Sequence, residues 1–367
     1  MRHLPMKQTS RIISTYSADT FGVCSALFEL GGMVVMHDAS GCNSTYTTHD
    51  EPRWFDMDSM VYISALTEME AIMGDDEKLI SDIVSAAEEL KPKFIAIVGT
   101  PIPTMVGFDF DAVASLIEER TGIPSFGFAT TGMNTYVHGI SMAMETLARH
   151  FVVDTGKKTE KPSVNILGLT PLDFSVNGQA ESLIQWAKGQ GYEVLSSWAM
   201  GSTLEEISRA GEAHLNLVVS AGGLKAAKVL EKRFGTPYIV GVPMDGKMEI
   251  SDLPGEDIVV IGEGVYSLSL ACTLERYLNR GVRVICATEC DGELLREKDM
   301  MLRDEAEIEK ALQSAEMIIA DPLYQPICPQ SARFVPLPAE SFSGRIYRKQ
   351  IPNLVADFEC FAKELRV

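Results

Sequence analysis

The sequence predicts an α/β fold of three Rossmann-like, doubly wound parallel-sheet domains around a central cleft. Short apolar runs that end in Gly, Pro, Asp or Ser alternate with amphipathic stretches, a rhythm that indicates parallel strands joined by right-handed crossovers. The chain has 367 residues, which suits three domains of about 100–150 residues each. A composition of 46% hydrophobic and 23% charged residues supplies the apolar surface that such domains bury.

The predicted strands are continuous apolar runs, which are typical of strands buried on both faces of a sheet. They are Gly32–Met36, Phe94–Gly99, Val164–Leu169, Leu215–Ser220, Tyr238–Val242, Ile258–Gly262, Val282–Thr288 and Met317–Ala320. The predicted helices between them have apolar residues at helical spacing. They are Asp75–Leu90, Ala112–Thr121, Gly139–Val152, Gln179–Gln190, Leu224–Phe234, Tyr266–Asn279 and Glu305–Ser314.

Two polar segments divide the chain into predicted domains 1–160, 161–245 and 246–367. Asp154–Pro162 is charged and ends in proline, and an apolar run begins directly after it. Pro243–Pro254 is a weaker joint, again followed by an apolar run. Because open parallel sheets bind ligands beyond the carboxyl ends of their strands, we expect the function in the loops that follow the strands.

The charge of the chain excludes two classes of partner. Lys and Arg total 32 against 51 Asp and Glu, a formal net charge of −19. A surface of that sign repels phosphate backbones and anionic lipid, so we expect no nucleic acid and no membrane as a partner. No apolar run reaches the ~18–20 residues that a bilayer span needs. The polar, basic stretch Met1–Arg11 lacks the apolar core of a signal peptide, which favours a cytoplasmic protein.

Common nucleotide-binding and hydrolytic motifs are missing from the sequence. The nearest match to a dinucleotide-binding loop, Gly262-Glu263-Gly264, lacks the third glycine and carries a carboxylate, so a tight strand-to-helix turn explains it better. There is no P-loop, and we expect this chain to bind no nucleotide. The G-x-S-x-G, H-E-x-x-H and C-x-x-C patterns are also absent.

Seven cysteines, an odd number spread along the chain, do not suggest a disulfide framework. Cys24 opens an apolar helical stretch and Cys42 follows the run GMVVM, so we expect both at loop positions where backbone N–H groups stabilise thiolates. Soft thiolates suit iron–sulfur binding, although a cubane needs four ligands and this neighbourhood offers two. The other five are expected to be core residues or to have no chemical role: Cys272, Cys286, Cys290, Cys328 and Cys360.

The residues around these two cysteines carry a resemblance. Cys24, followed by the run VMHDASGC that ends at Cys42, resembles the first two cluster-ligating cysteines of the nitrogenase component 1 family, whose second motif typically reads His-Gly-Pro-x-Gly-Cys. The segments SALTE and GDDEKL, from Ser64 and Gly74, resemble that family's next motif. The resemblance is collinear through all three units, and it implies the three-domain fold. The departures described next favour the nitrogenase-like branch that does not fix nitrogen.

One departure concerns the cluster. Thr100 stands where many relatives have a third cysteine, so this chain would supply Cys24 and Cys42 only. The resemblance then implies one [4Fe–4S] cluster held by four thiolates at the two-fold interface of a dimer, with a second copy or a paralogous chain as partner. The alternative is that the two cysteines are relics in a protein without a cluster.

A second departure concerns the cofactor. Ser220 occupies the position of the cysteine that anchors the iron–molybdenum cofactor, and Arg345 and Tyr347 lie in the loop that should carry its histidine. A FeMo-type cofactor is therefore not expected. The resemblance implies an enzyme, a nitrogenase-like reductase that takes electrons from an ATP-hydrolysing iron protein and reduces an organic small molecule. The alternatives are a scaffold for a cluster or cofactor precursor and, more distantly, a binding protein without a cluster.

In the family, the counterpart of the loop 130–138 faces the substrate cavity. The resemblance therefore implies that this loop lines the cavity here. Asn134 and His138 are candidate catalytic groups, since histidine can protonate a reduced intermediate near neutral pH, and helix capping is the alternative. Asp38, beside the cysteine motif, is a further candidate acid. The remaining candidates are as follows. Tyr136, Ser220, Arg345 and Tyr347 are expected to line the cavity, Arg53 and Trp54 to contact substrate or partner, and His37 and His49 to flank Cys42.

Overall fold

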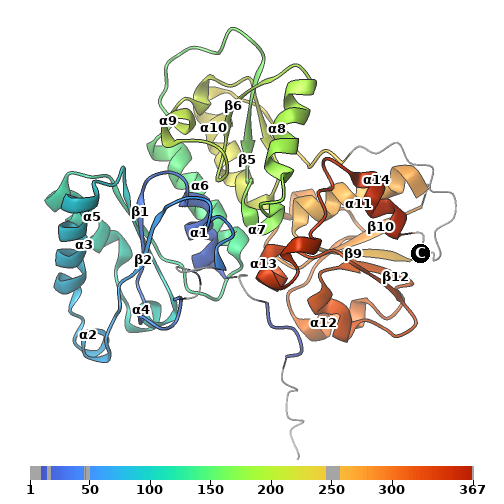
Figure 1. Ribbon diagram of the computed structural model, residues 1–367, viewed down its shortest axis with the longest axis horizontal. Coiled ribbons are helices and arrows are strands. Elements are labelled where there is room, and N and C mark those ends of the chain that lie inside the picture. The colour runs from blue at the N-terminus through green and yellow to red at the C-terminus, as the bar shows by residue number, and fades with distance from the viewer. Residues whose placement is uncertain are drawn as a thin grey trace, which may run out of the picture.

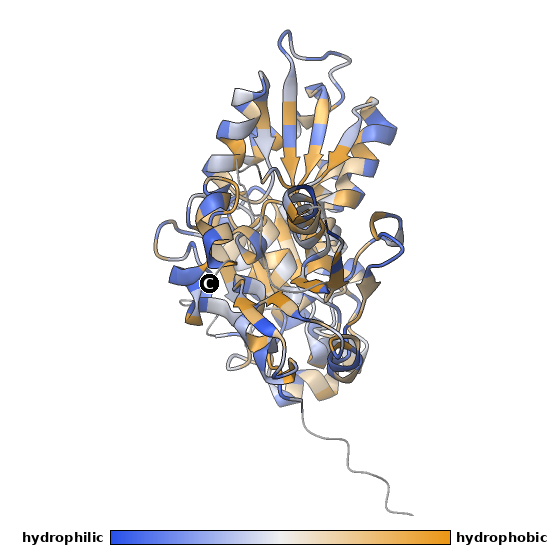
Figure 2. Cartoon of the chain, turned by 90° about the vertical axis from the view of Figure 1, so that its right-hand side faces the viewer, coloured by the Kyte–Doolittle hydropathy of each residue, from blue (hydrophilic) through white to orange (hydrophobic). Residues whose placement is uncertain are grey.

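The computed structural model describes residues 10–14, 18–44, 46, 50–244, 257–278 and 280–365. These residues form three parallel β-sheets, each flanked by helices, and Figure 1 shows them as three lobes. We call these lobes the first, second and third units. The predicted α/β class with three Rossmann-like units is confirmed. Figure 2 shows that the strands are largely apolar, whereas hydrophilic residues gather on the helices around them.

The first unit has a four-stranded sheet in the order β2-β1-β3-β4. Its strands are β1 (Met33–Met36), β2 (Met60–Ile63), β3 (Ile95–Val98) and β4 (Ser125–Phe128). Its helices are α1 (Asp19–Leu27), α2 (Glu68–Met73), α3 (Asp76–Leu90), α4 (Pro101–Val106), α5 (Phe110–Thr121) and α6 (Tyr136–His150).

The second unit has a four-stranded sheet in the order β6-β5-β7-β8. Its strands are β5 (Ser163–Leu167), β6 (Glu193–Ser197), β7 (Leu215–Val218) and β8 (Tyr238–Val240). Its α-helices are α7 (Pro171–Phe174), α8 (Gln179–Gly189), α9 (Leu204–Ser208) and α10 (Leu224–Phe234), and its 3-10 helices are η2 (Ala210–Glu212) and η3 (Ala221–Gly223).

The third unit has a five-stranded sheet in the order β11-β10-β9-β12-β13. Its strands are β9 (Ile258–Gly262), β10 (Val282–Cys286), β11 (Met300–Met301), β12 (Met317–Ala320) and β13 (Arg333–Pro336). Its α-helices are α11 (Gly264–Leu278), α12 (Glu305–Ala311), α13 (Glu340–Ser343) and α14 (Phe358–Glu364). Its 3-10 helices are η4 (Gly292–Leu294), η5 (Pro322–Ile327), η6 (Gly344–Ile346) and η7 (Arg348–Gln350).

Of the two segments expected to join the units, the structure describes the first in full and the second only in part. No helix or strand lies between His150 and Ser163, and Lys158 in that stretch donates hydrogen bonds to the second unit, to the carbonyls of Gly211 and Ala213 at 3.0 and 2.8 Å. The second expected joint, Pro243–Pro254, lies mostly outside the described residues.

Helices α1 and α6 cross at two glycines, and this contact fixes the helix that carries Cys24. A Cβ atom on Gly22 would lie 1.9 Å from the carbonyl oxygen of Tyr136, and one on Gly139 would lie 1.9 Å from the carbonyl oxygen of Asp19. Since any side chain at either position would overlap the opposing backbone, the close approach of the two helices requires both glycines.

The units are tied together by buried polar contacts. Arg53, which is 4% exposed, donates to Ala199 in the second unit at 2.8 Å, and Glu29 accepts from Gly201 at 2.8 Å. Between the second and third units, the Glu263 carboxylate accepts from the N–H of Ala221 at 2.8 Å. The described residues therefore form one packed assembly rather than three separate lobes.

Candidate functional site

Cys42 lies on an open turn after β1. The turn is held by Asp38, a buried carboxylate that accepts from the N–H of Ala39 and from the side chain of Asn43, both at 2.8 Å. Cys42 itself is exposed. Partial desolvation and the Asp38 carboxylate raise the pKa of its thiol. The expected loop position of Cys42 matches the structure, but the stabilised thiolate expected there is corrected, because the pKa of the thiol is raised.

A cavity of about 390 Å³ opens beside this turn. Cys42 and Asp38 line it together with Thr20 and Phe21 from the first turn of α1. Thr100 lines it as well, and its hydroxyl donates to the carbonyl of His37 at 2.8 Å. The position where relatives have a third cysteine is thus occupied by a hydroxyl that is already hydrogen-bonded within the fold.

Cys24 does not open a helix. Helix α1 begins at Asp19, so Cys24 lies well inside it, and its side chain is fully buried. It is four residues beyond Thr20 and therefore on the same helix face, one turn behind the cavity. Burial and the nearby Glu51 carboxylate raise the pKa of Cys24. The expectation of a thiolate stabilised at a helix start is therefore corrected for Cys24.

Arg53 has a structural role rather than the expected contact with substrate or partner. Its guanidinium donates to both oxygens of Glu51, at 2.9 and 2.8 Å, and to Glu29 at 2.9 Å. It also lies over the ring of Phe28, 4.6 Å from the centroid. The neighbouring Trp54 packs edge-on against Phe28, with ring centroids 5.6 Å apart. The side chains of Arg53 and Trp54 thus hold their own loop against the end of α1.

His37 is buried against the ring of Phe108, with centroids 4.4 Å apart, and its Nδ1 forms a 2.8 Å hydrogen bond with Ser64 Oγ. Burial lowers the pKa of His37 to about 4, so the ring is neutral at physiological pH. Its contacts favour the structural role. His49, the other flanking histidine, lies outside the described residues.

The loop that precedes α6 is organised by Asp19, a residue that the sequence interpretation missed. Its carboxylate accepts from the N–H groups of Thr131 and Gly132 at 3.1 and 2.7 Å, and from the side chain of Asn134 at 3.1 Å. An acidic residue at a helix start gives no sign by itself that it serves a loop more than a hundred positions away. Asn134 is consequently held in place rather than free to reorient.

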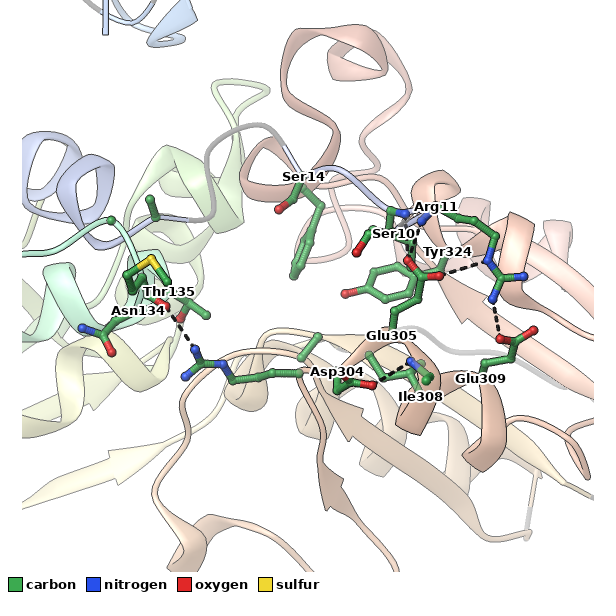
Figure 3. Close-up of a pocket in the computed structure, with 18 residues that line it drawn as sticks. Ser10, Arg11, Ser14, Asn134, Thr135, Asp304, Glu305, Ile308, Glu309 and Tyr324 are labelled. Carbon is green, nitrogen blue, oxygen red and sulfur yellow. Dashed lines mark hydrogen bonds and ion pairs between the residues drawn. The ribbon is translucent and has the colours of Figure 1, made fainter. Parts of the chain in front are cut away.

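A second, larger cavity of about 520 Å³ lies between this loop and the third unit. Figure 3 shows Asn134 and Thr135 on one side and Arg11, Glu305 and Tyr324 on the other. Its lining is mostly polar and includes both cationic and anionic side chains. The cavity shares two lining residues, Ala18 and Gly132, with the cavity beside Cys42, so the two spaces adjoin.

Arg303 and Glu289 tie the first unit to the third beside this cavity. Glu289 accepts from the N–H of Thr135 at 3.0 Å, and from Arg303 at 2.6 Å. Arg303 also donates to the carbonyl of Met133 at 3.2 Å. Neither residue was singled out from the sequence, because their partners are remote along the chain.

The predicted substrate-cavity residues are not brought together. Tyr136 is fully buried, and its hydroxyl donates to Asp173 of the second unit. Ser220 is also buried, and its hydroxyl donates to the Gly168 carbonyl at 2.9 Å. Arg345 is 59% exposed and pairs with Asp50 at 3.3 Å. The expectation of one cavity lined by these residues is corrected, because the first two hydroxyls are committed to contacts between and within units.

His138 and Tyr347 complete the set of predicted residues. His138 lines a separate cavity of about 280 Å³ with Lys228 and Cys290. Tyr347 is partly buried and follows the short 3-10 helix η6. Neither residue lines the 520 Å³ cavity that Asn134 does.

The junction of the three units is densely packed. Asp173, Glu263 and Ser341 surround a space of only about 30 Å³, room for a single water molecule. Burial raises the pKa of both carboxyl groups, and the Ser341 hydroxyl and one oxygen of Asp173 have no hydrogen-bond partner there. An organic substrate does not fit at this junction in the conformation described.

The Gly262–Gly264 segment is a strand-to-helix turn, as the sequence indicates. Strand β9 ends at Gly262 and α11 begins at Gly264. Between them, the Glu263 carboxylate accepts from the N–H of Tyr266 at 2.8 Å. The carboxylate thus occupies the helix N-terminus where a nucleotide phosphate would bind.

Two further observations bear on ligands. Within the described ranges, no group of three or more His, Cys, Asp or Glu side chains is placed to hold a metal ion, so Cys24 and Cys42 do not form a complete site in one chain. No described helix is long and apolar enough to cross a membrane.

Comparison with known proteins gives a family match. Residues 19–248 match the family model of the nitrogenase component 1 type oxidoreductases. The nitrogenase iron-molybdenum cofactor biosynthesis protein NifE of Clostridium pasteurianum is 32% identical over 180 residues, which cover 47% of this chain and 38% of that protein. A light-independent protochlorophyllide reductase subunit from Nostoc punctiforme is 27% identical over 184 residues, covering 47% of this chain and 35% of that protein. These matches span less than half the length of either relative.

The likeness to solved structures extends over the whole chain. A structure titled "Nitrogenase Cp1 at pH 6.5" superposes with a TM-score of 0.68 at 14% identity, covering 99% of this chain and 96% of that chain. A second, "Nitrogenase Cp1 at pH 5", gives a TM-score of 0.69 at 16% identity. At such identities the likeness concerns the fold alone.

Proposed function

Because the chain belongs to the nitrogenase component 1 type oxidoreductases, we propose that it is the substrate-reducing component of a nitrogenase-like system. It would take electrons from an ATP-hydrolysing iron protein through a [4Fe–4S] cluster shared with a second chain, and would reduce an organic small molecule. The observation that carries the proposal is the exposed Cys42 at a cavity that is also lined by Thr20, one helical turn before Cys24 in α1.

The residues fit such a cluster in ligand type and in number. Each chain offers two thiols on adjoining elements, and two chains related by a two-fold axis offer four. The raised pKa of Cys24 does not oppose ligation once iron is present, because the metal replaces the proton of a thiol ligand. The cluster, when bound, supplies single-electron transfer. Cys24 and Cys42 hold it, and Asp38 keeps the Cys42 turn in shape.

The substrate would bind in the cavity of about 520 Å³ that adjoins the cysteine cavity. Its volume is in the range of small-molecule sites, and its polar lining suits a polar organic molecule. Asn134 would orient the substrate, since Asp19 fixes its side chain. Ala18 and Gly132 line both cavities, and this adjacency favours electron transfer over a short path.

Reduction of dinitrogen is not part of the proposal. The Ser220 hydroxyl stands where the cofactor-anchoring cysteine is expected, and it donates to Gly168 instead of facing a cofactor. The tight junction around Asp173 and Ser341 leaves no room for a large metal cofactor. Both observations support a reductase that works without a FeMo-type cofactor.

A second candidate function is a scaffold that carries a cluster or a cofactor precursor. It is favoured by the 32% identity with a relative named as a cofactor biosynthesis protein. The two candidates differ in what leaves the protein. A reductase releases a reduced organic molecule and keeps its cluster, whereas a scaffold passes iron to another protein.

The proposal is tested by anaerobic purification followed by iron analysis and a visible absorption spectrum. We expect a brown protein with about four iron atoms per two chains. Iron-free protein after anaerobic reconstitution would contradict both candidates. Incubation with an iron protein and ATP then separates them, since release of iron to an apo-acceptor protein, with the cluster depleted, supports the scaffold.

A further inference from the structure

The third unit contains a second pair of cysteines, which the sequence interpretation set aside as inert. Cys286 ends strand β10 and Cys290 follows four residues later. Each thiol donates a hydrogen bond within this loop, Cys286 to the carbonyl of Thr288 at 3.3 Å and Cys290 to the carbonyl of Asp291 at 3.6 Å. Cys286 is fully buried and Cys290 is partly exposed. Such a pair combines a thiol that a reagent can reach with a second thiol directly behind it.

Both sulfur atoms pack against the start of α11. A Cβ atom on Gly264 would lie 2.6 Å from Cys290 Sγ and 3.3 Å from Cys286 Sγ. Only a glycine lets the two thiols sit side by side on this backbone. The neighbouring Cys286, partial burial and the carboxylates of Glu263 and Asp291 raise the pKa of Cys290. The reaction of Cys290 with a disulfide is therefore slow at neutral pH and faster at alkaline pH, where more of its thiolate forms.

Access to the pair comes through a cavity of about 280 Å³. Cys290 lines it, as do Lys225, Lys228 and His138. The carboxylates of Glu289 and Asp291 also line it, and Lys228 is paired with Asp291, so the mouth carries charges of both signs. A small disulfide molecule can therefore approach Cys290 but not the buried Cys286.

The residues on either side of Cys290 hold the third unit to the other two. Glu289 accepts from Thr135 of the first unit at 3.0 Å. Asp291 pairs with Lys228 of the second unit at 2.7 Å. We call these two contacts the 289/291 latch. Any movement of Cys290 must shift both contacts, because they are made by its immediate neighbours.

We propose that Cys286 and Cys290 form a redox-active dithiol, and that its oxidation by a low-molecular-weight disulfide loosens the 289/291 latch. In the first step, Cys290 attacks the reagent, forms a mixed disulfide and releases one thiol that carries away the proton. In the second, Cys286 attacks Cys290 Sγ, the intrachain disulfide forms and a second thiol leaves. Two protein thiols are oxidised and one reagent disulfide is reduced to two thiols.

Disulfide formation has to displace the loop. An S–S bond is about 2.05 Å long, much shorter than a contact between two thiols. Cys290 must therefore move toward the fixed end of β10, and the contacts of Glu289 and Asp291 lengthen with it. The inference is independent of the proposed function, since it involves neither Cys24 nor Cys42.

The test uses the full-length protein, reduced under anaerobic conditions and then exposed to oxidised glutathione. Trypsin releases both cysteines in one peptide, residues 284–296. In the wild type we expect this peptide to lose about 2 Da, the mass of two hydrogens, and to resist alkylation. Hydrogen exchange in the segments around Thr135 and Lys228 should rise on oxidation, as the latch loosens.

Single variants make the assignment specific. Cys286→Ser should retain glutathione on Cys290, because the resolving thiol is absent. Cys290→Ser should leave Cys286 unmodified, because that thiol is buried. Cys272→Ser, at an exposed position on α11, should behave as the wild type. A reduced peptide in the wild type, or a glutathione adduct that persists on Cys290, would overturn the dithiol. Unchanged exchange after the disulfide forms would overturn the latch.

Discussion

The two cysteine pairs of this chain, Cys24 with Cys42 and Cys286 with Cys290, are built in opposite ways. The first pair lies on separate elements, one thiol buried in α1 and the other exposed on a turn, and it lacks further ligands among the described residues. The second pair lies in one short segment, with both sulfur atoms packed against Gly264 at and just after the end of β10. The first arrangement calls for a partner chain, and the second can react within one chain.

The largest difference between the two pairs is expected in iron binding, which should depend on the first pair and not on the second. Cys42→Ala should abolish iron binding, because a shared cluster then loses one thiolate from each chain and stands open to solvent. Cys286→Ala should keep the wild-type iron content, since that pair takes no part in the cluster. The measurement is iron per chain after anaerobic purification. Equal iron in both variants would contradict the assignment.

The close packing of α1 against α6 should contribute strongly to the stability of the fold. Gly139→Ala places a methyl group 1.9 Å from the Asp19 carbonyl. Overlap with backbone cannot be relieved by a side-chain rotation, so we expect a loss of about 3 kcal/mol in the free energy of unfolding. Denaturant unfolding measures this.

A matched control is Gly189→Ala at the end of α8, where a Cβ meets no atom within 4 Å. There the replacement should be neutral or stabilise the protein by up to about 1 kcal/mol, because it restricts the unfolded chain. If both variants lost the same stability, the glycine contact between α1 and α6 would not be what holds the Cys24 helix.

The first pair's neighbourhood should also make stability depend on pH. His37 has a pKa lowered from 6.5 to about 4 by burial, so the unfolded chain takes up a proton first as the pH falls. The contribution of neutral His37 to the free energy of unfolding is fully present above pH 6.5. It is lost as the pH falls toward 4, by about 3 kcal/mol. Plots of the free energy of unfolding against pH for the wild type and His37→Asn should therefore converge or cross between pH 6.5 and 4. Parallel curves would show that His37 is not buried as a neutral ring.

The smallest effect is expected at the latch of the second pair. Lys228→Gln removes the ion pair with Asp291, whose lysine is 45% exposed. Exposed pairs contribute little, so the reduced protein should lose less than about 1 kcal/mol. Thermal unfolding of reduced wild type and variant measures the difference. A much larger loss would contradict the small contribution expected of a solvent-exposed ion pair.

Much of the fold could be predicted, and the strands that were missed have a common cause. Central strands such as β9 and β12 are buried on both faces, and their continuous apolar runs reveal their bounds. The five strands without such a signal are all at sheet edges, where one side is exposed or covered by loops. They are β2, β4, β6, β11 and β13.

The site was predicted less completely, for a different reason. The exposed turn of Cys42 follows from its place after a strand. The burial of Cys24 depends on where α1 begins, and that start involves Asp19, whose partners are in the loop around residues 131–134. The pairing of Cys286 with Cys290 depends on Gly264 in the next helix. Contacts between remote segments leave no local periodicity to read.

The central claim, one cluster shared by two chains through Cys24 and Cys42, is tested most directly by native mass spectrometry of the anaerobically purified protein. We predict a species of two chains with one four-iron cluster, and no cluster on a single chain. In the Cys42→Ala variant that species should lose the mass of the cluster. A single chain that carries a complete cluster would contradict the account.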